Sequence, residues 1–245
     1  MPVKVAVIDS GLSVAVASQL GVCLHGSVAF AADPSCGAVC SVAPVADCLG
    51  HGTEVTRLVM AAAPAAHLLS AQVFAGHDPV SSAVVAAAID WAVVRGAQLI
   101  NLSLGLRADS AVLRQACREA QAAGVLLVGS APARGGPVYP ATYAGVIAVS
   151  GDARCAPGQW SLIECTPEGT ALIGACPGAQ PRDATSSAEH RVPGRGASYA
   201  AARITGILAA MLARTPANHR DDVLAYLATG AAFIGRERRS QERAA

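Results

Sequence analysis

The chain has 245 residues, of which 53% are hydrophobic, so it can bury a large core within one domain. Its formal charge is +1 at neutral pH, which excludes the long-range field that would attract nucleic acid or an anionic membrane. No signal peptide precedes the first apolar run, and polar residues and a proline interrupt the apolar region 58–75, so we expect a soluble, cytoplasmic protein.

The predicted elements alternate between β-branched apolar runs and stretches whose apolar residues recur at helical spacing. Residues 21–50 are predicted to form irregular loops around a strand, and residues 150–197 short antiparallel strands and surface loops. The alternation is typical of right-handed βαβ crossovers and predicts an α/β fold, with a mostly parallel central sheet and helices on both faces. In chain order, strands are predicted at 3–8, 67–74, 98–103, 125–128 and 144–149, and helices at 54–63, 80–95, 111–123, 204–213 and 221–228.

Three residues with catalytic chemistry stand at the boundaries of these elements. Asp9 ends the first strand, at the edge of an α/β sheet where catalytic groups gather. His51, between two glycines, opens a helix, and Ser198 lies at or near the start of another, where free N–H groups favour negative charge. Such residues can act as orienting acid, general base and nucleophile.

Each of the three residues also has a purely structural interpretation. Ser198 could cap its helix by accepting a hydrogen bond from the first turn. Asp9 could form a turn and cap the segment after it, and a lone histidine such as His51 is more often structural than catalytic. The three residues favour catalysis because they occur together in one chain.

Eight cysteines are present, and without an export signal we expect reduced thiols that fill small apolar gaps. One disulfide in the region 23–48 is an alternative. The spacing of Cys36, Cys40 and Cys48 raises a zinc hypothesis, but no second tight pair or suitably spaced histidine supports it, so we expect no metal. The cysteines lie at positions 23, 36, 40, 48, 117, 155, 165 and 176.

The order Asp, His, Ser is that of subtilisin, and the surrounding motifs resemble those of the subtilisin-like serine proteases, or subtilases. Residues 7–11 (VIDSG), 50–53 (GHGT) and 196–201 (GASYAA) resemble the family's aspartate, histidine and serine motifs, with Ala197 in place of the usual Thr. The resemblance runs from about residue 3 to residue 230 and implies a three-layer subtilisin-like fold. We therefore expect a peptidase domain over 1–235 and a charged tail over 236–245.

The resemblance also indicates residues that would contact a substrate. Residues 100–105 (INLSLG) resemble the family's substrate-binding strand. It implies that Ser103, Leu104 and Gly105 line the cleft and pair with the substrate backbone as an added strand.

The chain departs from the family at the oxyanion hole. Subtilases usually place an Asn after the strand equivalent to 125–128, where its side chain helps to bind the oxyanion. Here Ala133 takes that place by alignment, and Ser130 or Arg134 could substitute in part. Losing this donor in subtilisin itself costs about 10²–10³ in turnover, so the resemblance implies slower catalysis of the same kind. The backbone N–H of Ser198 would still donate.

Two further departures concern ions and folding. The segment after His51 lacks the insertion that builds a calcium loop in many secreted subtilases, so no structural calcium is expected there. There is also no room before Val3 for the propeptide that secreted members use in folding. The resemblance implies a minimal intracellular subtilase that folds unaided and needs no cofactor.

The implied function is a serine endopeptidase that forms an acyl-enzyme on Ser198. A weakened oxyanion hole suits limited cleavage of one dedicated peptide or protein partner, because a well-oriented substrate offsets poor turnover. Leader-peptide removal is the preferred setting, since similar small subtilases serve quinohemoprotein amine dehydrogenase and ribosomal-peptide maturation. The alternative is a catalytically silent protein of this fold that binds a peptide or partner enzyme without cutting it.

Overall fold

The computed structural model describes residues 2–76, 79–165, 171–179, 196–215 and 220–237. The strands in this part of the chain form one sheet, in which nearly all neighbouring strands run parallel. The strands are β1 (Lys4–Asp9), β2 (Cys23–Ala32), β3 (Val39–Val42), β4 (His67–Gln72), β5 (Leu99–Leu102), β6 (Leu126–Ser130), β7 (Ile147–Gly151), β8 (Trp160–Cys165), β9 (Ala171–Ala175) and β10 (Phe233–Ile234).

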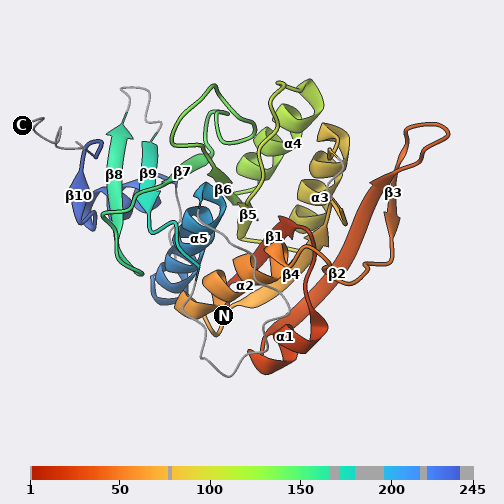
Figure 1. The fold of residues 1–245 in the computed structure, drawn as a ribbon, viewed down its shortest axis with the longest axis horizontal. Coiled ribbons are helices and arrows are strands. Elements are labelled where there is room, and N and C mark those ends of the chain that lie inside the picture. The colour runs from red at the N-terminus through yellow and green to blue at the C-terminus, as the bar shows by residue number, and fades with distance from the viewer. Residues whose placement is uncertain (1, 77–78, 166–170, 180–195, 216–219, 238–245) are drawn as a thin grey trace, which may run out of the picture.

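The strand order across the sheet is β10-β8-β9-β7-β6-β5-β1-β4-β2-β3, with antiparallel pairing between β2 and β3 and between β8 and β9. Figure 1 shows the β2–β3 hairpin at one end of the sheet and β8, β9 and β10 at the other. The helices are α1 (Val14–Gln19), α2 (His51–Ala62), α3 (Ser82–Val94), α4 (Ala111–Ala122), α5 (Ala197–Arg214) and α6 (Arg220–Thr229).

Helices cover both faces of the sheet, and the alternation of side chains along β1 shows why. Val5 and Val7 point into the core that α2 and α5 cover, whereas Ala6 and Ile8 point into the core under α3 and α4. A strand that is apolar on both faces has to be covered on both faces. The predicted three-layer α/β architecture with a mostly parallel sheet is confirmed.

The region 21–50 is more regular than predicted. The ten-residue strand β2 pairs in parallel with β4 from Cys23 to Ala29, and its last four residues pair with β3 as a hairpin. Most side chains of β2 and β3 are exposed or half-buried, so the sequence lacks the apolar run that marks a buried strand. The prediction of irregular loops was wrong because backbone pairing with β4 holds the segment.

Two other predicted regions, 150–197 and 236–245, are described by the structure only in part. The antiparallel β8–β9 pair lies within residues 150–197 as expected, although residues 180–195 lie outside the described part. Of the predicted tail over 236–245, Arg236 forms an ion pair of 2.6 Å with Glu164 on β8, and residues 238–245 lie outside the described part. No helix in the described ranges is long and apolar enough to cross a bilayer.

The cysteines fill apolar gaps at fewer positions than predicted. Cys117 and Cys155 are buried, and burial raises the pKa of the Cys117 thiol to about 12. In contrast, the cysteines at positions 23, 36, 40 and 48 are exposed free thiols.

Candidate active site

Asp9 is a buried carboxylate at the carboxyl end of β1, with a side chain that is 1% exposed. Its Oδ1 atom lies 2.7 Å from Nδ1 of His51 and accepts the backbone N–H of Ser10 at 2.6 Å. A carboxylate only accepts hydrogen bonds, so Nδ1 carries the proton and Nε2 of His51 is left to accept one. Asp9 therefore sets the tautomer that a general base requires.

His51 is the first residue of α2, and two glycines allow it to sit against Asp9. Gly50 adopts a left-handed conformation with φ of 67°, which turns the chain into the helix. A Cβ atom at Gly52 would overlap the carbonyl oxygen of Gly11, so only glycine lets α2 start this close to the end of β1. The imidazole remains 25% exposed, which leaves it accessible to a substrate.

Asp47 fixes the loop that carries His51, although it was not among the residues predicted from the sequence. Its Oδ1 accepts the Ser10 hydroxyl at 2.8 Å and the Gly50 N–H at 2.9 Å. Its Oδ2 accepts the N–H and the hydroxyl of Thr53 at 2.9 and 2.6 Å. The signal that could have revealed it is an Asp three residues before a helix-opening glycine, where its side chain can close an Asx-type turn.

The two aspartates act together on the protonation of His51. Burial lowers the pKa of the imidazole, but the charge and hydrogen bond of Asp9, with the charge of Asp47, outweigh this effect. The net result is a pKa above the ordinary value of 6.5. A raised pKa makes His51 a stronger base once it is neutral.

Ser198 is the second residue of α5, so its backbone N–H is among the first N–H groups that lack an acceptor within the helix. It does not cap the helix: the N-cap is Gly196, and no side chain bonds there. The Ser198 hydroxyl donates to the carbonyl of Ser103 at 3.0 Å, and the Ser103 hydroxyl donates back to the carbonyl of Ser198 at 2.9 Å.

The starts of α2 and α5 lie next to each other on the same face of the sheet. The ring of Tyr199 stacks on that of His51 with centroids 5.8 Å apart, and the two helices are in contact (Figure 1). Among the described residues no hydrogen bond joins Ser198 to His51, because the hydroxyl is directed at Ser103. Rotation of Ser198 about χ1 would release the hydroxyl from Ser103 and point it in another direction.

A buried network holds the start of α5 over the end of β5. The Asn101 side chain donates to the Ser103 hydroxyl at 2.8 Å and accepts the Thr205 hydroxyl at 3.0 Å. Asn101 and Thr205 are fully buried, so these bonds satisfy groups that would otherwise cost free energy. No role was predicted for either residue: Asn101 lies within the INLSLG stretch, where only Ser103, Leu104 and Gly105 were expected to contact a substrate, and Thr205 lies inside an apolar helix.

The predicted substrate-binding residues differ in exposure. Ser103 and Leu104 are 3% and 8% exposed, whereas Gly105 reaches the surface. A Cβ atom at Gly105 would press on the side chain of Val138 at 3.2 Å. The accessible part of this segment is therefore its backbone, the part that would pair with an extended peptide.

The three residues of the predicted oxyanion region differ in burial. Ser130 is buried at the end of β6, and its hydroxyl donates to the carbonyl of Leu104 at 3.3 Å. Ala133 and Arg134 follow it on an exposed segment. In the described part of the chain, no hydrogen bond or ion pair joins any of the three to Asp9, His51 or Ser198.

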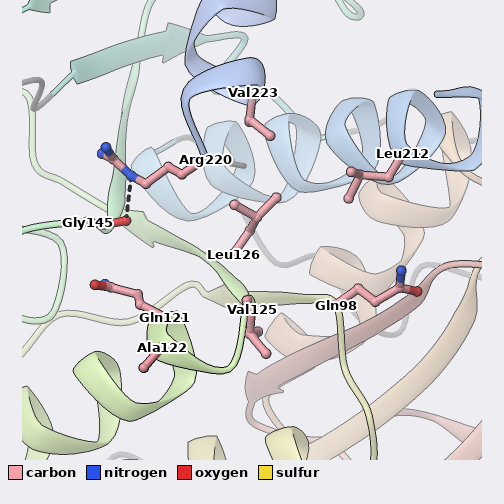
Figure 2. A pocket seen from close by; sticks show the side chains of 10 residues that line it. Gln98, Gln121, Ala122, Val125, Leu126, Gly145, Leu212, Arg220 and Val223 are labelled. Carbon is pink, nitrogen blue, oxygen red and sulfur yellow. Dashed lines mark hydrogen bonds between the residues drawn. The ribbon is translucent and has the colours of Figure 1, made fainter. Parts of the chain in front are cut away.

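A cavity of about 390 Å³ lies at the opposite edge of the sheet (Figure 2). It is bounded by the end of α4, the start of β6 and the ends of α5 and α6 that face them. Arg220 reaches across one side, where its Nε donates to the carbonyl of Gly145 at 3.0 Å. None of the predicted catalytic residues lines this cavity, so it is not the place where Ser198 would meet a substrate.

Comparison with known proteins identifies relatives over most of the chain. A profile described as the subtilase family matches residues 2–243. A thermostable alkaline protease of Halalkalibacterium halodurans is 30% identical over 244 residues, which cover 95% of this chain and 63% of the relative. Subtilisin Savinase of Lederbergia lenta is 33% identical over 159 residues, which cover 60% of this chain and 54% of that protein. The chain thus spans less than two thirds of the length of these relatives.

Two solved structures of similar fold are a maturation protease and a lanthipeptide protease. The prenylagaramide maturation protease PagA superposes with a TM-score of 0.65 at 23% identity, over 91% of this chain and 81% of that one. A lanthipeptide protease superposes with a TM-score of 0.62 at 18% identity, over 91% and 78% of the two chains. At these identities the similarity concerns the fold.

Proposed function

The chain belongs to the subtilase family, and on that premise we propose that it is a serine endopeptidase that cleaves one dedicated peptide or protein partner. The observation that carries the proposal is the buried Asp9 paired at 2.7 Å with His51, beside a helix start that presents Ser198. A binding protein would have no use for a buried carboxylate that fixes a histidine tautomer.

The proposed reaction begins with the Ser198 hydroxyl turning from the Ser103 carbonyl toward Nε2 of His51. His51 takes the proton while Oγ forms a bond to the peptide carbonyl carbon. The N–H of Ser198 and the positive end of α5 stabilise the oxyanion. The tetrahedral intermediate then loses its amine, which takes the proton from His51, and water releases the acyl group by the reverse sequence of steps.

The narrower part of the proposal is that the partner is a precursor that loses a leader peptide. The similarity of fold to PagA and to a lanthipeptide protease supports this setting, as does the absence of an Asn at Ala133. A modified ribosomal peptide or a small subunit of a quinohemoprotein amine dehydrogenase are the substrates to try first. Tight docking of such a partner would offset a slow chemical step.

A fluorophosphonate probe tests the chemistry without knowledge of the substrate. It should add its mass to the wild-type protein and not to Ser198→Ala, and peptide mapping should place the adduct on Ser198. Ser35→Ala is the matched control, because it removes the hydroxyl of an exposed serine in the turn between β2 and β3 but leaves the proposed nucleophile. A folded wild-type protein that gains no mass would contradict the proposal and favour a silent binding protein.

A further inference from the structure

Three side chains that can bind metal meet at the amino ends of β2 and β4, at the edge of the sheet opposite Asp9. They are Cys23, His25 and His67, and one ligand atom from each lies within 4.8 Å of the other two. We propose that these residues bind a thiophilic divalent metal ion of the Zn²⁺ type, with water as the fourth ligand.

The pairing of β2 with β4 explains how three residues far apart in the sequence come together. Cys23 stands directly opposite His67 in the parallel register, so their side chains leave the same face of the sheet. The register then shifts between Leu24 and Gly26, which makes His25 the extra residue of a bulge. The bulge keeps His25 near the first pair, and its ring stacks on that of His67 with centroids 4.0 Å apart.

The ligand set fits zinc better than the other common ions. A thiolate and two imidazoles are borderline-soft donors, whereas calcium and magnesium require oxygen ligands. Bond lengths of about 2.0–2.3 Å place tetrahedral ligand atoms about 3.3–3.6 Å apart, so the ligand atoms would have to approach by at most about 1.5 Å. Cys23 and His25 are exposed and have the freedom to make this movement.

Two cationic side chains, Lys4 and Arg95, lie near the cluster. The two cations are themselves directed at backbone oxygens: Arg95 donates to the carbonyl of His25 at 2.9 Å, and Lys4 to that of Arg95 at 3.2 Å. The thiolate of Cys23 would offset one charge of the metal.

This site differs from the zinc pattern considered in the sequence. Cys36, Cys40 and Cys48 are exposed, but they are not part of the ligand cluster found in the described residues. A bound ion would instead link the first residues of β2 to the first residue of β4, at the side of the sheet that ends in the β2–β3 hairpin (Figure 1). Its effect would be on the stability of this edge, and its test does not depend on catalysis.

The test is titration of the full-length reduced protein with Co²⁺ and then Zn²⁺. We expect one equivalent of Co²⁺ to give a sulfur-to-metal charge-transfer band, and one equivalent of Zn²⁺ to displace it and raise the melting temperature. Cys23→Ser should abolish the band, and His67→Asn should weaken binding at least tenfold. Both variants should keep the far-ultraviolet circular dichroism of the wild type.

Matched controls separate this site from adventitious binding by other thiols. The triple variant Cys36→Ser, Cys40→Ser, Cys48→Ser should retain the band and the affinity of the wild type. A band that disappears in the triple variant, or that persists in Cys23→Ser, would overturn the proposal. So would a wild-type protein that binds no stoichiometric metal at micromolar concentrations.

Discussion

The two edges of the sheet hold their functional side chains in opposite ways. At the carboxyl edge, Asp9 and Asp47 are buried and receive hydrogen bonds from backbone and side chains, so His51 has a fixed orientation and a raised pKa. At the amino edge, Cys23 and His25 are exposed and the cluster is held mainly by strand pairing. The comparison teaches that a fixed side-chain geometry requires buried, hydrogen-bonded groups. Catalysis at the carboxyl edge needs such a geometry, whereas binding of an ion at the amino edge does not.

The largest expected effect comes from breaking the buried pair at the carboxyl edge. Asp9→Asn leaves the shape of the side chain but no longer fixes the His51 tautomer, so acylation should slow by about 10⁴-fold at neutral pH, as in other serine proteases. Single-turnover kinetics on an activated ester would measure it. Asp90→Asn, an exposed aspartate on α3, is the control and should match the wild type. A loss below tenfold would show that the pair is structural.

The motifs that indicate a candidate site at the carboxyl edge are local in the sequence. VIDSG, GHGT and GASYAA each place one candidate catalytic residue within a few positions of the small residues that shape its turn. Asp47 was missed, although it lies only four residues before His51, because part of its role depends on Ser10, which comes from a distant segment of the chain. Local motifs therefore identify the reacting groups but not the residues that hold them.

The amino edge could not be predicted from the sequence for a different reason. Cys23 and His67 are 44 positions apart, and only the register of β2 against β4 brings them together. The bulge that retains His25 depends on Gly26, whose missing side chain leaves room for Leu69, Trp91 and Arg95. Because most side chains of β2 are exposed or half-buried, its sequence lacks the apolar pattern that predicts a strand. Its pairing with β4 therefore could not be predicted either.

A second test concerns the predicted oxyanion region at the carboxyl edge, where Ala133 offers no side-chain donor. Ala133→Asn should place an amide donor near the oxyanion and raise the acylation rate on a short peptide by up to about 10²-fold. Single-turnover rates of Ser130→Ala and Arg134→Ala give the necessary comparison. If Ala133→Asn has no effect while either alanine variant is severely impaired, an existing side chain already fills the role and catalysis is not weakened.

A smaller effect should follow from changing the charge of Asp47. In the wild type, acylation should rise with pH as His51 loses its proton, with a midpoint above 6.5, because Asp9 and Asp47 favour the imidazolium. Asp47→Asn removes one of these charges, so the midpoint should move down toward 6.5. The plateau rate should fall about tenfold, because Asn cannot accept all the hydrogen bonds that hold Thr53 and Gly50. An unchanged midpoint would show that Asp47 acts on position alone.

The smallest expected effect is that of metal removal on activity. Cys23 on β2 and Asp9 on β1 lie at opposite ends of strands that β4 separates, and the six residues of β1 span about 17 Å, so an ion at one edge is too far to orient groups at the other. EDTA should therefore change the acylation rate less than twofold at 25 °C.

Chelation should still lower the stability of the protein, although it leaves the acylation rate nearly unchanged. This contrast distinguishes the role of the amino edge from that of the carboxyl edge. An ion present at 100 times its Kd adds about 2.7 kcal/mol to the free energy of unfolding, which corresponds to roughly 5–10 °C in Tm for a domain of this size. EDTA should remove that increment from the zinc-loaded wild type and leave the Tm of Cys23→Ser unchanged. A rate that falls on chelation in the wild type but not in Cys23→Ser would mean that the amino edge controls the carboxyl edge through β1, and the two edges would then not be independent.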